Sequence, residues 1–63
     1  MPTELLTLEQ AAERLNVPLA TLRFWRHKGG GPPSALIGRR VMYRGADLEA
    51  WLDRKFADAL KGA

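Results

Sequence analysis

Residues 7–28 of this chain read TLEQAAERLNVPLATLRFWRHK, and this stretch decides the fold. Thr7 and Gln10 have the spacing of a capping box, in which the threonine hydroxyl accepts from the Gln10 backbone and the glutamine side chain reaches back. A helix should therefore begin here, and the apolar residues that follow recur at helical spacing on one stripe: Leu8, Ala11, Ala12 and Leu15. Asn16 tolerates the left-handed backbone conformation, so we expect the helix to end there in a sharp turn.

A second helix is expected from about Pro18 to Lys28. Proline suits the first helical turn because its missing N–H has no intrahelical partner to lose. Leu22 and Trp25 can face the first helix. The polar and basic residues lie elsewhere around the surface of the second helix: Thr21, Arg23, Arg26, His27 and Lys28. Two short helices joined by a tight turn, the second strongly basic, form a helix-turn-helix pattern.

The next stretch, GGGPPS at residues 29–34, predicts a stiff corner. Gly29 can end the second helix in the left-handed conformation, and Pro32 and Pro33 prevent helix from resuming. A phosphate-binding loop is a poor alternative, because no strand precedes the stretch, no Gly-Lys-Ser/Thr ending closes it and no helix follows. A flexible linker is also a poor alternative, because the residues beyond are too few for a second domain.

Two short strand-like runs, ALI at 35–37 and VMY at 41–43, flank Gly38 and two arginines. They predict a β-hairpin with Arg39 and Arg40 at its tip. A two-stranded hairpin is marginal in water, so it should pack on the helices. The side chains expected to do this are Ile37, Val41 and Tyr43. An alternative role for the two arginines is protection of the strand edges against aggregation.

A last helix should start at residues 45–47, where Asp47 and then Glu49 complement the positive end of the helix dipole. Its apolar residues recur at helical spacing, so this helix should cover the core as a lid: Leu48, Trp51, Leu52, Phe56, Ala59 and Leu60. Both tryptophans, Trp25 and Trp51, are expected in the core rather than as stacking platforms for bases. A frayed tail is expected over residues 61–63. The prediction is one domain, residues 1–63, mainly α with a small β-hairpin.

The formal charge of +3 is unevenly distributed. Residues 1–17 carry −2 and residues 45–63 carry −1, whereas residues 18–44 carry +6 and hold no acidic side chain. This asymmetry favours a polyanionic partner. The alternative is a basic face that is simply solvated.

Several function classes are disfavoured by composition. The chain has no cysteine and one histidine, His27, which favours neither a disulfide framework nor a metal site. No apolar run approaches the roughly 20 residues that span a bilayer, and residues 1–4 lack a basic secretory start, so a cytoplasmic protein is expected. With one serine, Ser34, and no base–nucleophile pair, we expect no enzyme activity and no cofactor.

Taken together, four stretches resemble the MerR-like winged-helix family of phage excisionases and small regulators. They are residues 6–17 (LTLEQAAERLNV), 21–26 (TLRFWR), 38–44 (GRRVMYR) and 47–52 (DLEAWL). The chain departs from that pattern at Asn16, where the family usually has glycine. It also departs at Pro18, where a serine often caps the second helix. The resemblance covers nearly the whole chain and implies a winged helix-turn-helix fold.

The resemblance implies duplex DNA as the partner, with the second helix in the major groove and the hairpin wing on the adjacent minor groove or backbone. Arg23 is then expected to hold a phosphate, and Thr21 and Arg26 to contact the groove, with Leu19 and Ala20 as further candidates. Arg39 and Arg40 would form the wing contact, with Arg39 inserted. The remaining two predicted contacts, to the DNA backbone, are Lys28 and Arg44.

Sensor proteins of this family carry a dimerising helix and an effector region after the winged helix, and this chain stops at Ala63. The expectation is therefore an excisionase, monomeric alone, that binds and bends attachment-site DNA cooperatively and directs an integrase toward excision. The first alternative is a small transcription regulator of the same fold, because fold does not fix function. The second is a protein-interaction module that docks through Phe24 or the outer face of the last helix.

Overall fold

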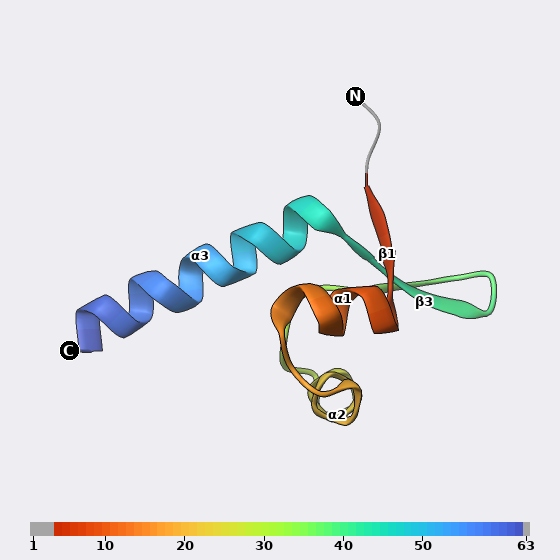
Figure 1. Ribbon diagram of the computed structural model, residues 1–63, viewed down its shortest axis with the longest axis horizontal. Helices are drawn as coiled ribbons and strands as arrows, with labels where there is room; N and C mark the ends of the chain where they lie inside the picture. The colour runs from red at the N-terminus through yellow and green to blue at the C-terminus, as the bar shows by residue number, and fades with distance from the viewer. Residues whose placement is uncertain (1–3, 63) are drawn as a thin grey trace.

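A computed structural model describes residues 4–62, and Figure 1 shows its arrangement. The elements follow in the order β1 (Leu5–Thr7), α1 (Leu8–Leu15), α2 (Leu19–Lys28), β2 (Ala35–Ile37), β3 (Arg40–Arg44) and α3 (Gly45–Gly62). Three helices and a small antiparallel sheet make a mainly helical, winged helix-turn-helix fold, as predicted. None of the helices in the described range is long and apolar enough to span a membrane.

The turn between α1 and α2 is built as the sequence predicts. The Thr7 hydroxyl accepts from the Gln10 N–H at 3.1 Å, and the Gln10 side chain accepts from the Thr7 N–H at 2.9 Å, which completes the capping box. Asn16 adopts the left-handed conformation at φ 59° and ψ 43° and ends α1. The next N–H, from Val17, donates to the Ala12 carbonyl at 3.0 Å. The chain therefore turns sharply enough for α2 to lie across α1.

Helix α2 begins one residue later than expected. Pro18 has the extended conformation of an N-cap, at φ −60° and ψ 146°, and no side chain caps the helix. Its carbonyl accepts from the N–H groups of Thr21 and Leu22 at 3.0 and 3.2 Å, so proline serves as the cap rather than as the first helical residue. Gly29 ends α2 at φ 85°, a left-handed conformation that glycine adopts without steric cost, and this prediction is confirmed.

The sheet has three strands where the sequence predicted two. β3 lies in the middle and pairs antiparallel with β2 on one side and with β1 on the other. The register places Leu6 opposite Tyr43. β1 was missed because a strand of three residues, the last of which is the helix cap Thr7, is too short to show an alternating pattern. Its pairing with β3 gives the hairpin the additional strand that such small sheets need for stability.

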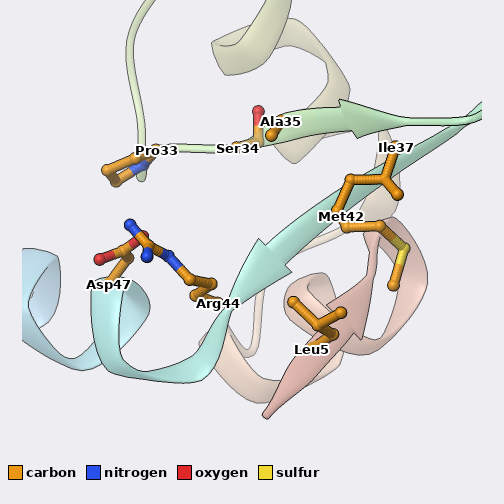
Figure 2. A pocket seen from close by; sticks show the side chains of 8 residues that line it. All are labelled: Leu5, Pro33, Ser34, Ala35, Ile37, Met42, Arg44 and Asp47. Atoms are coloured by element: carbon orange, nitrogen blue, oxygen red, sulfur yellow. The ribbon is translucent and has the colours of Figure 1, made fainter. Parts of the chain in front are cut away.

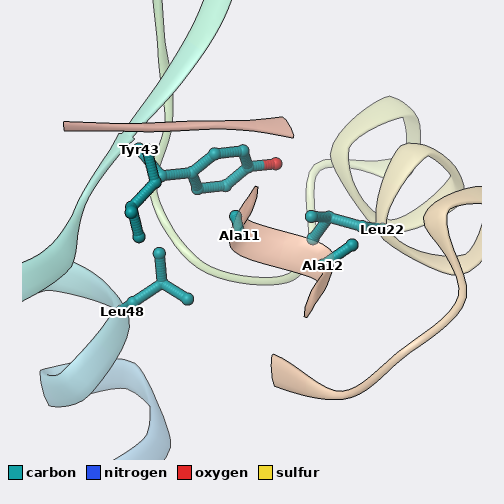
Figure 3. Packing of buried hydrophobic residues seen from close by; sticks show 6 residues of the cluster. Ala11, Ala12, Leu22, Tyr43 and Leu48 are labelled. Atoms are coloured by element: carbon teal, nitrogen blue, oxygen red, sulfur yellow. The ribbon is translucent and has the colours of Figure 1, made fainter. Parts of the chain in front are cut away.

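A compact set of buried side chains joins the sheet to the helices. Its members are Leu6, Ala11, Ala12, Leu22, Tyr43 and Leu48. Figure 3 shows the Tyr43 ring extending from β3 over Ala11 of α1. Val41 packs against this cluster as expected, but Ile37 is 53 % exposed. Ile37 pairs with Arg40, so alternation places both on the sheet face opposite to Tyr43.

Helix α3 covers the core only with its first half. Leu48 is fully buried, but Phe56 and Leu60 are 68 % and 79 % exposed, so the predicted lid over the whole helix is wrong. Figure 1 shows why, because α3 leaves the end of β3 and extends beyond the other helices. The helix also runs through Gly62, where a frayed tail was expected, and Ala63 lies outside the described residues.

Both tryptophans are half-buried rather than fully enclosed. Trp25 packs against the core cluster, and its ring centroid lies 5.7 Å from that of Trp51, with the ring planes tilted by 46°. The pair therefore joins α2 to the first half of α3.

Candidate nucleic-acid interface

The outer face of α2 is defined by its one fully buried residue, Leu22. Successive residues of an α-helix are about 100° apart, so the side chains farthest from Leu22 are those of Ala20, Phe24 and His27. All three are exposed. Arg23 and Lys28 flank this face on either side, and both are exposed as well. α2 thus presents to solvent a basic surface with an apolar centre.

Of the two predicted groove contacts on α2, Thr21 lies at the margin of this face and Arg26 lies outside it. Thr21 is half-buried, whereas Arg26 is exposed but lies on the side of α2 nearer to Leu22. Arg26 is close enough to the Tyr43 phenol to influence its ionisation. Burial raises the pKa of Tyr43, and both the Ser34 hydroxyl and the positive charge of Arg26 partly offset that rise. Arg26 is therefore placed where α2 approaches the strands of the wing.

The wing carries the other predicted contacts. Arg39 lies in the turn between β2 and β3, Arg40 begins β3, and both are exposed. Arg40 also borders a surface hollow with Thr7, Leu8 and Glu9, at the start of α1. The structure therefore keeps these two arginines together at the tip of the hairpin, as the sequence predicted.

Arg44 is separated from the other predicted contacts. It lies at the opposite end of β3, and its Nε donates to Asp47 of α3 at 2.8 Å. Figure 2 shows the pair beside Pro33, on the same side of the sheet as Leu5, Ile37 and Met42. Its guanidinium already has a carboxylate partner, unlike the arginines of α2 and of the wing tip.

Ion pairing divides the cations of residues 4–62 into two groups. Arg14 pairs with Glu4 and Arg44 with Asp47, and these are the salt bridges of the described range. The other eight cations have no carboxylate partner within that range: three lie on α3 (Arg54, Lys55 and Lys61), and five lie on α2 and the wing (Arg23, Arg26, Lys28, Arg39 and Arg40). Their charge is therefore uncompensated by the protein and available to a polyanion.

The glycine-rich corner, residues 29–34, fixes the direction in which the chain leaves the C-terminal end of α2. The Gly30 N–H donates to the Trp25 carbonyl at 2.8 Å. Gly31 has φ 79°, and a Cβ there would lie 3.1 Å from the Trp25 Cβ. Pro32 is buried beside it. The corner packs against the tryptophan of the helix it follows, which agrees with the predicted stiff turn and with neither a linker nor a phosphate loop.

Sequence reasoning left Phe24 and His27 on the α2 surface without a role in DNA binding. Phe24 is 57 % exposed near the centre of the outer face, whereas the sequence suggested it only as a contact of a protein-interaction module. The signal that could have found it is its spacing from Leu22, because two residues correspond to about 200° around a helix. No group of three metal-binding side chains occurs among the residues that the structure describes.

Residues 5–55 match the family model described as a helix-turn-helix domain, a stretch that runs from β1 into α3. No curated protein and no solved structure matches the chain.

Proposed function

Because the chain belongs to the helix-turn-helix domain family, we propose that it binds duplex DNA sequence-specifically, with α2 in the major groove and the β2–β3 wing on the adjacent minor groove or backbone. The observation that carries this proposal is the set of five unpaired cations on α2 and the wing tip. An α-helix fits the major groove of B-DNA, where arginine can bind guanine through two hydrogen bonds. In a narrow minor groove arginine responds mainly to groove shape.

The cations have graded roles in this proposal. Arg23 and Lys28, on the two flanks of the outer face of α2, bind phosphates on either side of the groove. Thr21 contacts the groove from the margin of the outer face and Arg26 from the side of α2 that approaches the wing, and Arg39 enters the minor groove from the wing tip with Arg40 beside it. Arg44 contributes least, because DNA would have to compete with Asp47 for its guanidinium.

The finer proposal is an architectural role of the excisionase type. Its support is the resemblance of the four sequence stretches, in order and spacing, to the MerR-like winged-helix family, which includes phage excisionases and small regulators. In this role neighbouring protomers bind adjacent sites and bend the DNA, so that an integrase is directed toward excision. Bending the DNA costs a few kcal/mol, which the added protein–DNA contacts offset.

The test is selection of preferred sites from a random duplex library, followed by footprinting and a bending assay on the selected duplexes. Direct repeats spaced by one helical turn, with strong bending and a monomeric free protein, are expected. An inverted repeat with little bending would instead indicate a transcription regulator, since twofold operators match twofold protein dimers. Binding no tighter than that of a charge-matched peptide would contradict DNA recognition altogether and favour a protein-interaction module.

A further inference from the structure

The outer face of α2 carries a row of three exposed side chains, four residues apart: Ala20, Phe24 and Lys28. Residues at this spacing lie one above the other on a helix. The Lys28 Nζ lies 5.7 Å from the centroid of the Phe24 ring, within cation–π range. The row therefore presents a methyl group and an aromatic ring, with a cation at its C-terminal end.

This apolar row lies on the part of α2 that faces away from the domain. Leu22 is fully buried on the opposite side, whereas Phe24 is 57 % exposed. A helix that enters the major groove with its outer face would bring Ala20 and Phe24 to the base edges.

Apolar side chains can recognise one feature of the major groove. Thymine carries a 5-methyl group there, and alanine and phenylalanine side chains are among those that contact it. We propose that Phe24 and Ala20 together contact a thymine 5-methyl group and make thymine the preferred base at that position of the site. This inference rests on the proposed DNA binding and adds a preference for thymine that the phosphate-binding cations, Arg23 and Lys28, do not supply, because phosphate contacts carry no sequence information.

The experiment uses the whole chain and the best duplex from the random-library selection. Each thymine of that duplex is replaced in turn by deoxyuridine, which removes only the methyl group, and the dissociation constant is measured. One position, or two adjacent ones, should lose about fourfold in affinity, the value for one buried methyl group. In Phe24→Ala the penalty at that position should disappear, while circular dichroism stays unchanged.

Phe56→Ala is the matched control, because it removes another exposed phenylalanine, on α3. This variant should keep the full deoxyuridine penalty. The inference is overturned if the wild type tolerates every deoxyuridine, or if the penalty persists in Phe24→Ala. Either result, with site-specific binding intact, leaves the proposed function standing. Failure of the selection to yield any preferred duplex would overturn both.

Discussion

At the scale of single residues, Glu4 and Arg14 hold the first strand against the first helix. The Arg14 guanidinium donates two hydrogen bonds to the Glu4 carboxylate, at 2.8 and 2.9 Å, and the Glu4 carbonyl accepts from the Gly45 N–H at 2.9 Å. One residue thus connects β1 to both α1 and the start of α3. The hydrogen bonds from Arg14 lower the pKa of Glu4.

This pair predicts a stability difference that depends on pH. The folded state holds Glu4 ionised more strongly than the unfolded chain does, so the stabilisation is present above the ordinary glutamate pKa and is lost as pH falls below about 4. The melting temperature of Arg14→Gln should therefore lie below that of the wild type at neutral pH, and the gap should narrow on acidification. A gap that stays constant from pH 7 to pH 3 would show that the ion pair does not stabilise the fold.

The raised pKa of Tyr43 leads us to expect that the stability of the fold decreases at alkaline pH. Burial raises its pKa in the folded state, so above about pH 10 the unfolded chain loses a proton that the folded domain retains. Stability should therefore fall as the pH rises past the ordinary tyrosine value. Tyr43→Phe keeps the ring and removes the ionisation, so urea unfolding of this variant should change less between pH 8 and pH 11. Equal alkaline losses in both proteins would assign the effect to other groups.

At the scale of elements, the wing is the part whose contribution can be separated from the fold. Arg39 and Arg40 are exposed, and the core contacts of β3 come from other side chains, Val41 and Tyr43. Each neutralised phosphate contributes about −0.9 to the slope of log affinity against log salt concentration. Replacing both arginines by alanine should therefore weaken DNA binding and make that slope less steep by up to about 2, with unchanged helical circular dichroism.

The matched control for the wing removes the same charge from α3, as Arg54→Ala with Lys61→Ala. Both residues are exposed on the helix that extends away from the wing and α2. This double variant should change the salt slope less than the wing variant does. Equal slopes would indicate that net charge, rather than the wing, governs binding, and loss of fold in the wing variant would assign its arginines a structural role.

The sequence predicted the elements whose signals are local. A few neighbouring residues were enough to predict each of them: the capping box, the Asn16 turn, the end of α2 at Gly29 and the hairpin. What it could not predict depends on distant partners. β1 exists because β3 is there to pair with it, and Ile37 is exposed because of its register with Arg40. The apolar pattern of α3 continues past Trp51, but nothing in that pattern states where the body of the domain ends.

For the candidate interface, too, some features were predictable from the sequence and others were not. The distribution of charge along the chain located the basic segment, and the resemblance supplied the roles of its residues. The structure added which cations are free of acidic partners, and it set Arg44 apart because Asp47 is its neighbour across the β3–α3 junction. It also placed Phe24 near the centre of the outer face. The roles of the individual residues in DNA binding stay predictions.

At the scale of the whole molecule, stability should depend on the first half of α3 and little on its second half. Leu48 is fully buried, so Leu48→Ala should cost about 2–5 kcal/mol, enough to unfold much of so small a domain. Trp51 is only half-buried, so Trp51→Ala should cost less than Leu48→Ala. Urea unfolding monitored by circular dichroism measures the free energy of unfolding of both variants. Phe56→Ala is the control, with a value expected within about 0.5 kcal/mol of wild type. A larger loss for Phe56→Ala than for Leu48→Ala would contradict this description of α3.

The molecular dimensions agree with this division of α3. The radius of gyration is 12.1 Å, and the longest extent is 41 Å against a shortest of 19 Å. A compact chain of this length has a radius of gyration of about 11 Å. The excess follows from α3, which continues beyond the body that its first half covers (Figure 1).

The pairing of β1 with β3 also determines when the domain can form during synthesis. Leu5 of β1 cannot pair until Arg44 of β3 has been synthesised. A ribosome working at about 5–20 residues per second adds Arg44 about 2 to 8 seconds after Leu5. Through that interval α1 and α2 exist without the strand that covers Ala11, and the core still lacks Leu48. The domain therefore completes its sheet and its core in one late event, because the strand made first has no partner until the last strand has been added.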